Sequence, residues 1–303
     1  MEDLTKVKDL TIQNCEELVP LWSNDVGLLK NLPCLHLLRI SDCPKLVSLV
    51  TKEVEQQLQL GLPSKLKAIE ITDCSVLKSL PKPMMCNNMY VESIYISGCT
   101  SLAYFAISQL PPTLKRLWIA HCNMLVLVDG DDVNNCSSNT SLLKFLHIDD
   151  CPSLISLTST EELPATLKEL EILDCKKLES IAKSFHHNLS LEVIRIHSCQ
   201  NLKSLPMGIQ SLCHLDKIFI FNCQTLGSFP NKGLLPANLR SLGISECEKM
   251  QVLPNCILNL TSFQNLSIRK CPNINVSFSE VGFPTNLTSL SIDDMVLFNE
   301  TFF

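Results

Sequence analysis

The sequence lacks several features that mark common protein classes. No apolar run approaches the ~18 residues that a membrane-spanning helix needs, and the N-terminal segment MEDLTKVKDL has no apolar signal-peptide core. Charged residues make up only 18% of the chain and the net charge is −6, which excludes the strongly basic footprint of a nucleic-acid-binding domain. We therefore expect a chain in the cytosol or the nucleus, with no membrane span and no nucleic-acid partner.

Motifs of common enzyme and metal sites are also missing. The histidines show no H-E-x-x-H spacing, and neither a G-x-S-x-G elbow nor a G-x-x-x-x-G-K-[ST] phosphate loop is present. The nearest glycines, in GSFPNKG, have the wrong spacing for a phosphate loop. The sequence thus predicts no catalytic residue, no cofactor and no metal site, and we expect a protein that is not an enzyme.

The chain contains 16 cysteines, and most of them recur at one fixed position of a repeated motif. The repeated motif is L-x-x-L-x-I-x-x-C-x-x-L. It begins at Val7, Leu35, Leu66, Val91, Leu114, Leu143, Leu167, Leu191, Leu215, Leu239, Phe263 and Leu287. The spacing between units is 23 to 31 residues before Leu143 and 24 residues from there on. Cysteine fills its slot in every unit except the twelfth, which has Met295.

The motif predicts the architecture. The alternation L-x-I points two apolar side chains of a short strand inward, as for Ile194 and Ile196. One such strand is too short to bury a core by itself, so the strands must stack into a parallel sheet over one apolar column. Prolines flank many units and disfavour helix in the return path, and TKEVEQQLQL (51–60) is the best helical candidate.

The pattern predicts that the motif cysteine is a buried packing residue. Its slot follows the strand, points inward and must meet backbone polar groups that the turn frees, which a buried thiol can do weakly. One cysteine per unit offers no clustered ligand pair for zinc, and a regular ladder directs the thiols in parallel instead of toward each other. A reducing compartment would also keep the thiols reduced.

The motif with its S-L-P tail, and linkers such as LPATLKELEI and LPANLRSLGI, resembles the leucine-rich repeat region of plant intracellular disease resistance proteins of the coiled-coil nucleotide-binding class. The resemblance covers residues 7 to about 298. It implies an α/β solenoid, a horseshoe of about 12 repeats with a parallel sheet on the concave face and a largely irregular or 3₁₀ convex face. We expect a single domain over 1–303, irregular over 7–142 and regular over 143–298, with no nucleotide-binding domain in the chain.

The resemblance also implies a role in plant defence, with a protein partner. That partner would be a pathogen effector, a guarded host protein or a nucleotide-binding domain of the receptor itself. The alternative is an extracellular leucine-rich repeat receptor or inhibitor. Eight N-x-[ST] sequons favour this alternative, at Asn135, Asn139, Asn188, Asn259, Asn265, Asn275, Asn286 and Asn299. The absence of a signal peptide and of a paired-cysteine cap counts against it.

Side chains between the two inward residues of each strand should face the partner. Aromatic residues and arginine on such a face are typical interface anchors. We therefore predict a partner-binding surface in two clusters. The first comprises Tyr95, Arg116, Trp118, Phe145 and His147, and the second comprises Phe219 and Phe221. Arg195 and His197, on the strand before the second cluster, are further outward-facing candidates.

Acidic residues recur in the slot directly after the strand. They are Asp42, Asp73, Asp150, Asp174, Glu246 and Asp294. The pattern indicates a broken acidic rim that is solvated or bonds turn amides, with attraction to a basic partner as the alternative. The polar insertion DGDDVNNCSSNTS (129–141) is predicted to be a mobile loop.

Overall fold

The structure is a computed structural model of the 303-residue chain. It describes residues 4–22, 32–51, 63–81, 90–105, 110–127, 142–158, 163–230, 234–251, 253, 257, 259–274 and 283–293. The chain divides into two compact units, Met1–Ser153 and Leu154–Phe303, called here the N-unit and the C-unit. Each unit is a parallel β-solenoid with almost no helix in its described residues.

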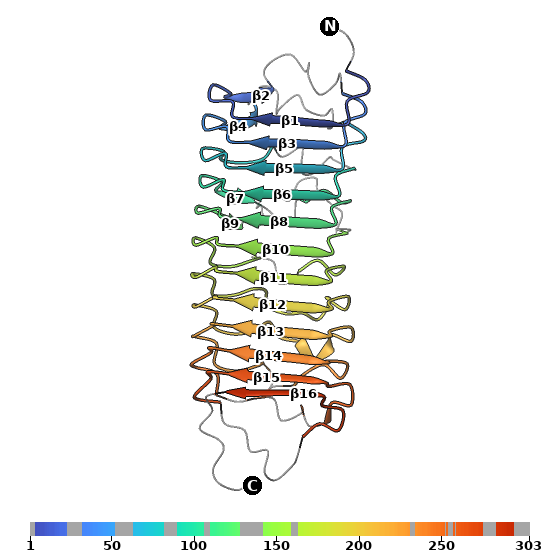
Figure 1. Ribbon diagram of the computed structural model, residues 1–303, viewed down its shortest axis with the longest axis vertical. Coiled ribbons are helices and arrows are strands. Elements are labelled where there is room, and N and C mark those ends of the chain that lie inside the picture. Colours follow the sequence, from blue (N-terminus) through green and yellow to red (C-terminus); the bar gives the residue numbers. More distant parts are fainter. Residues whose placement is uncertain are drawn as a thin grey trace. The chain divides into compact units, whose positions relative to one another are not determined.

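The N-unit contains a sheet of parallel strands in chain order (Figure 1). These strands are β1 (Asp9–Gln13), β3 (Leu37–Ser41), β5 (Ala68–Thr72), β6 (Ser93–Ser97), β8 (Arg116–Ala120) and β10 (Phe145–Asp149). Two smaller parallel pairs lie in the return path. They are β2 (Pro20–Trp22) with β4 (Ser48–Val50), and β7 (Tyr104–Phe105) with β9 (Val126–Leu127). The motif isoleucines are in register, Ile71 opposite Ile40 on one side and Ile96 on the other.

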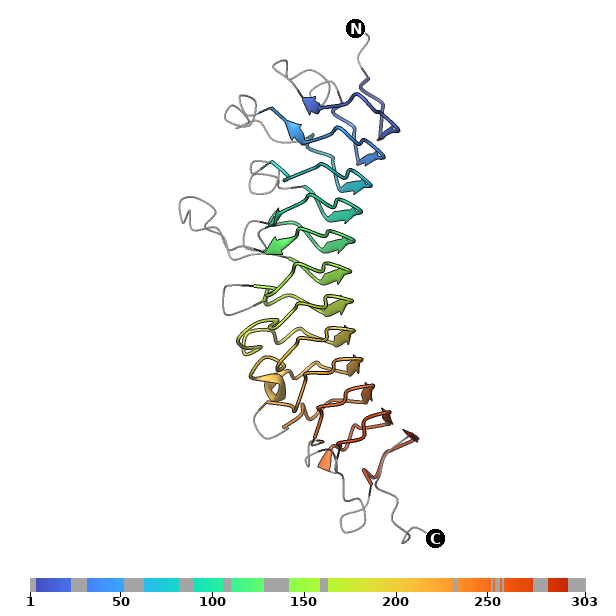
Figure 2. The ribbon, with the colours of Figure 1, turned by 90° about the vertical axis from the view of Figure 1, so that its left-hand side faces the viewer.

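The C-unit repeats the same plan with equal spacing. Its strands are β11 (Glu169–Leu173), β12 (Val193–His197), β13 (Lys217–Phe221), β14 (Ser241–Ser245), β15 (Asn265–Arg269) and β16 (Ser289–Asp293). Its return path carries the 3₁₀ helix η2 (Ile209–Ser211). In each unit the strands lie along one side and the return segments along the other (Figure 2). The near-absence of α-helix in the described return segments agrees with the expectation from the flanking prolines.

The apolar core runs beneath the strands. Ile194 and Ile196 of β12 are buried, whereas Val193, Arg195 and His197 on the same strand keep part of their surface exposed. This alternation confirms the inward direction that the L-x-I pattern predicts. Because each rung shares its apolar side chains with its neighbours, the core is a continuous column in each unit.

The motif cysteines complete that column. In the N-unit the Sγ atom of Cys43 donates to the carbonyl oxygen of Ser41 at 3.3 Å, and in the C-unit Cys223 donates to Phe221 at 3.4 Å. The motif cysteines from Cys43 to Cys271 are buried, and all the cysteines in the described part of the chain are free thiols. Burial raises the pKa of Cys99 to about 12 and that of Cys223 to about 11. At Cys99 and Cys223 the slot therefore holds a protonated thiol that donates to the turn carbonyl, whereas a hydrogen bond with Cys247 lowers the pKa of Cys271 to about 7.

The residue directly after each strand adopts a left-handed backbone conformation. Its φ is positive, such as 52° at Asp73, 67° at Gly98 and 49° at Asp174. Histidine, serine, asparagine, glutamate and lysine fill the slot on other rungs. The N–H of Asp73 donates to Ser97 O at 2.9 Å on the next rung, and that of Asp174 to His197 O at 2.9 Å. Aspartate and asparagine tolerate this left-handed conformation better than most residues, so backbone geometry is one reason why they recur here.

Some sequence expectations concern residues outside the described ranges. These are most of the helical candidate 51–60, the insertion 129–141, Asp294 and Met295. Within the described ranges, no helix combines the length and apolar character that crossing a bilayer requires.

Candidate protein-binding surface

Three rings line up on adjacent strands of the N-unit. Tyr95, Trp118 and His147 occupy the middle of β6, β8 and β10 in direct register. The Tyr95 and Trp118 ring centroids lie 5.9 Å apart with a tilt of 32°, and Trp118 stacks on His147 at 3.4 Å and 21°. Tyr95 is 37% exposed and Trp118 40%, but His147 is only 7% exposed. The two exposed rings therefore form an aromatic ridge, and His147 is its buried base.

The flanks of the aromatic ridge are small or cationic. Ser97 and Ala120 stand opposite each other at the ends of β6 and β8. On the other side the guanidinium of Arg116 lies 5.2 Å from the centroid of the Phe145 ring, within cation–π range. Small neighbours leave the sides of the Tyr95 and Trp118 rings accessible, so the ridge can enter an apolar pocket of a partner.

In the corresponding cluster of the C-unit, the side chains make more contacts with neighbouring residues of the same unit. Arg195 pairs with Glu169 at 3.4 Å, and His197 stacks on Phe221 with centroids 4.3 Å apart. Phe219 is 39% exposed, and its ring covers Gly243 so closely that a Cβ built there would lie 2.8 Å from Phe219 Cδ1. Of this cluster, Phe219 offers the most apolar contact surface.

The structure thus sorts the predicted surface residues. Tyr95, Arg116, Trp118 and Phe219 are exposed. Phe145, Arg195, His197 and Phe221 are half-buried, and His147 lies beneath Trp118. The burial of His147 departs from the prediction of an outward-facing contact residue, because the large indole of the preceding rung covers the imidazole. Sequence spacing alone does not show which ring lies over which.

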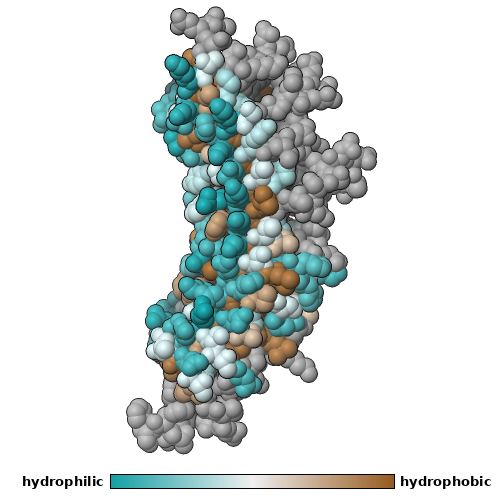
Figure 3. Space-filling view, turned by 90° about the vertical axis from the view of Figure 1, so that its right-hand side faces the viewer, coloured by the Kyte–Doolittle hydropathy of each residue, from teal (hydrophilic) through white to brown (hydrophobic). Residues whose placement is uncertain are grey.

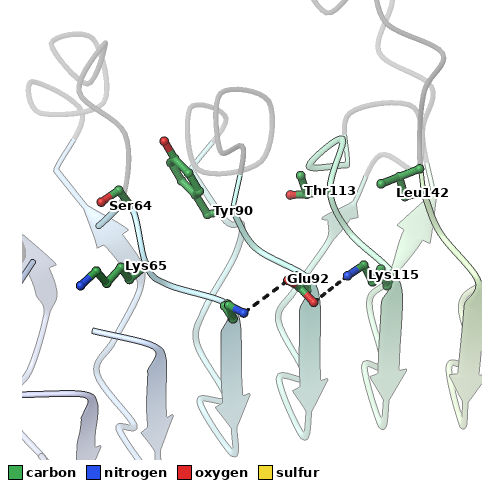
Figure 4. A pocket seen from close by; sticks show the side chains of 8 residues that line it. Ser64, Lys65, Tyr90, Glu92, Thr113, Lys115 and Leu142 are labelled. Carbon is green, nitrogen blue, oxygen red and sulfur yellow. Dashed lines mark hydrogen bonds and ion pairs between the residues drawn. The ribbon is translucent and has the colours of Figure 1, made fainter. Parts of the chain in front are cut away.

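Sequence reasoning missed a second feature at the edge where the strands begin. Glu92 lies between Lys67 at 3.7 Å and Lys115 at 2.8 Å, on three successive rungs of the N-unit (Figure 4). A hydrogen bond from Lys115 lowers the pKa of the Glu92 carboxyl. A cavity of about 210 Å³ opens above them and is also lined by Tyr90 and Leu142. The available signal was the residue that directly follows the first motif leucine of each unit.

The described ranges contain no group of three or more histidine, cysteine, aspartate or glutamate side chains placed to hold a metal ion.

Comparisons with known proteins concern the fold alone. No protein-family model and no curated protein matches the sequence. Among solved structures, the leucine-rich repeat domain of the type III effector XopL is 19% identical, covers 82% of this chain and 77% of its own, and gives a TM-score of 0.39. The plant peptide hormone receptor RGFR1, in complex with RGF2, is 14% identical, with coverages of 96% and 58% and a TM-score of 0.32.

A bacterial structure is similar to the same degree. The functional domain of InlJ from Listeria monocytogenes, which includes a cysteine ladder, is 13% identical, with coverages of 95% and 68% and a TM-score of 0.31. The fold assignment rests on the repeat motif and on the strand register in each unit. The described residues of each unit therefore form a parallel β-solenoid built on the leucine-rich repeat motif of the sequence.

Proposed function

We propose that this chain is the recognition region of a plant intracellular immune receptor, and that it binds a protein partner through the open face of its sheet. The partner would be a pathogen effector, a guarded host protein or the nucleotide-binding domain of the receptor. The cysteine-containing repeat with its S-L-P tail supports the receptor class, and the proposed location is the cytosol or the nucleus.

The exposed aromatic ridge is the observation that carries the binding proposal. Tyr95 and Trp118 expose more than a third of their surface on a rigid sheet, where a soluble chain gains nothing from leaving large rings in water. Tyrosine, tryptophan and arginine dominate the energetics of protein interfaces, and Arg116 stands beside the ridge. The proposal includes no catalytic role for the chain.

The extracellular alternative meets an obstacle at one sequon. The side chain of Asn188 is fully buried, and its Nδ2 donates to Leu163 O and Pro164 O, both at 2.9 Å. A glycan on Nδ2 would have no room and would disrupt both hydrogen bonds. Secreted expression with glycan mapping tests this, because a folded, secreted chain with a glycan on Asn188 would remove the obstacle.

The binding proposal is tested by quantitative affinity capture from plant cells. Three baits are compared: wild type, the double variant Tyr95→Ala/Trp118→Ala, and the control Met124→Ala. Met124 is 57% exposed in the same unit but lies outside the strands. We expect specific proteins that wild type and Met124→Ala retain equally and that the double variant loses. If all three baits retain the same proteins in the same amounts, the ridge is not the binding surface.

A further inference from the structure

A column of side chains follows the edge where the strands of each unit begin. In the N-unit its members are Lys8, His36, Lys67, Glu92, Lys115 and Lys144. From His36 onward, each backbone N–H donates to the carbonyl oxygen of the column residue on the preceding rung, for example Glu92 N to Lys67 O at 2.8 Å and Lys115 N to Glu92 O at 2.8 Å. These hydrogen bonds fix the column at the rung spacing of ~4.8 Å.

The charge of this column differs between the two units. In the N-unit it holds four lysines against one glutamate, a formal charge of +3 with His36 neutral. In the C-unit it holds Lys168, Glu192, Asp216, Arg240, Gln264 and Thr288. There Lys168 pairs with Glu192, and Arg240 pairs with Asp216 at 3.3 Å, so the column is neutral. Seen from this edge, each unit shows a mainly hydrophilic border with separate hydrophobic groups (Figure 3).

A cavity marks the middle of the N-unit column. Its floor is formed by Lys67, Glu92 and Lys115 (Figure 4), and Lys65 lines its rim. The ammonium groups of Lys67 and Lys115 face the Glu92 carboxylate, whereas that of Lys65 points away, toward Cys34 Sγ at 3.6 Å. The volume of about 210 Å³ is below the ~300 Å³ at which pockets for small-molecule ligands begin, and it suits one or two side chains of a partner.

The walls of the cavity are partly apolar. Tyr90 is 49% exposed and Leu142 is 43% exposed, on opposite sides of the opening. An apolar side chain can contact both walls while an acidic neighbour reaches the ammonium groups. Positive charge beside exposed apolar surface is the complement of an acidic segment with an apolar anchor.

We infer that the strand-start edge of the N-unit binds an extended acidic segment of a protein partner. This inference rests on the proposed function, because it names the chemistry of the partner that a recognition module would bind. The segment places one apolar side chain between Tyr90 and Leu142, and carboxylates beside Lys67 and Lys115.

The rung spacing sets the expected sequence of that segment. Lys67 and Lys115 are two rungs apart, hence ~10 Å apart along the stack. A peptide in the extended polyproline II conformation rises ~3.1 Å per residue with three residues per turn, so the side chains of residues i and i+3 lie on the same face, ~9 Å apart. Two acidic residues separated by two others, one of them apolar, therefore match the column.

A nucleic acid fits this edge less well. The whole chain carries a net charge of −6, which repels a polyanion at long range. Glu92 in the centre of the column would also face the phosphates. A short peptide with two carboxylates needs only the local positive charge of the column.

The experiment is peptide display on the full chain, followed by fluorescence anisotropy. Random 12-residue peptides are selected on wild type, and the best peptide is measured beside a copy in which glutamine and asparagine replace its acidic residues. We expect selected peptides with two acidic residues three positions apart. We also expect about tenfold weaker binding to Lys67→Gln/Lys115→Gln, from the loss of two charge pairs.

Two further variants keep the test independent of folding. The control Lys203→Gln/Lys217→Gln removes the same charge from the C-unit and should bind the peptide as wild type does. Glu92→Gln should bind it about threefold more tightly, a gain that misfolding cannot produce. Selection without acidic enrichment overturns the inference, as does equal loss in both lysine variants. Tighter binding of a single-stranded RNA of equal length than of the peptide also overturns it.

The outcome is separable from that of the proposed function. If Tyr95→Ala/Trp118→Ala loses its captured proteins while Lys67→Gln/Lys115→Gln keeps them and no acidic peptide is selected, the recognition role stands and the acidic segment is excluded. If the acidic peptide binds at the column but the ridge variant retains every captured protein, the aromatic ridge is excluded as the binding surface and the acidic-segment site at the strand-start edge stands.

Discussion

The N-unit and the C-unit have cores of the same design but different surfaces. In both, leucine and isoleucine alternate inward, a thiol bonds the turn carbonyl, and a left-handed residue ends the strand. At the positions that the motif leaves free, the N-unit has an aromatic ridge and an unbalanced cationic column. The C-unit has paired charges there, and Phe219 packs on Gly243. The repeat thus specifies the scaffold, and the free positions give each unit a different surface.

The two cores should respond equally to a buried charge, and this is the largest effect we expect. Ile196→Asp in the C-unit or Ile71→Asp in the N-unit places an unpaired carboxylate in the apolar column. We expect the free energy of unfolding to fall by about 4 kcal/mol or more for each, measured by chemical denaturation. A large loss in one unit and a small loss in the other would show that the cores are not equivalent.

The buried thiols should make stability depend on alkaline pH. The pKa of Cys99 is raised to about 12 in the folded state, against ~8.5 for an unfolded thiol. Below that lower value both states are protonated and the stabilisation is complete. As the pH rises further, the unfolded chain loses the proton first and the stabilisation decreases by ~1.4 kcal/mol per pH unit, until the pH passes the folded pKa.

Denaturation of variants between pH 7.5 and 10.5 checks this pH dependence. Cys99→Ala in the N-unit and Cys223→Ala in the C-unit should each show a shallower decline than wild type, by about 2 kcal/mol at pH 10. Replacing the exposed Cys213 by alanine is the control and should leave the decline unchanged. An unaltered slope in Cys99→Ala would mean that its thiol ionises as readily when folded as when unfolded.

The left-handed slot should tolerate asparagine in both units but not a β-branched residue. Asp174→Asn and Asp42→Asn keep a side chain suited to positive φ, so we expect changes within about 0.5 kcal/mol. Asp174→Val and Asp42→Val should destabilise by about 1–2 kcal/mol, measured from denaturation midpoints. If the asparagine variants lose as much stability as the valine variants, charge and not conformation governs the slot.

The smallest effect on stability is expected at Gly243 of the C-unit, which the Phe219 ring covers. Gly243→Ala adds a Cβ that meets the Phe219 ring, which is partly exposed and can swing away. We expect a loss within about 0.5 kcal/mol, seen as a small shift of the thermal midpoint. A loss above 2 kcal/mol would show that Phe219 is held as rigidly as a core residue.

The scaffold was readable from the sequence because its physics is local and periodic. Leucine, isoleucine and cysteine at fixed offsets predicted the strands, their inward faces and the bond from the cysteine to the turn, and Ile194, Ile196 and Cys223 lie accordingly. The left-handed φ at Asp73 and Asp174 was legible only as a preference for aspartate, which has more than one cause.

The candidate sites were only partly readable because they depend on contacts between rungs. The sequence places Trp118 and His147 on one face, but stacking decides that the imidazole is buried and the indole is exposed. The cationic column requires comparing one position across every unit, Lys67 and Lys115 included, and the low overall charge of the chain hides it. The cavity between Tyr90 and Leu142 has no sequence signature.

Photocrosslinking most directly tests the claim that the N-unit ridge, and not the C-unit cluster, contacts the partner. A photoreactive phenylalanine replaces Tyr95 in one version of the chain and Phe219 in another, and both are irradiated in plant cells. We predict discrete crosslinked species from position 95 that disappear when Trp118→Ala is added, and none from position 219. Crosslinks from position 219 alone, or equal crosslinks from both positions that survive Trp118→Ala, would contradict the claim.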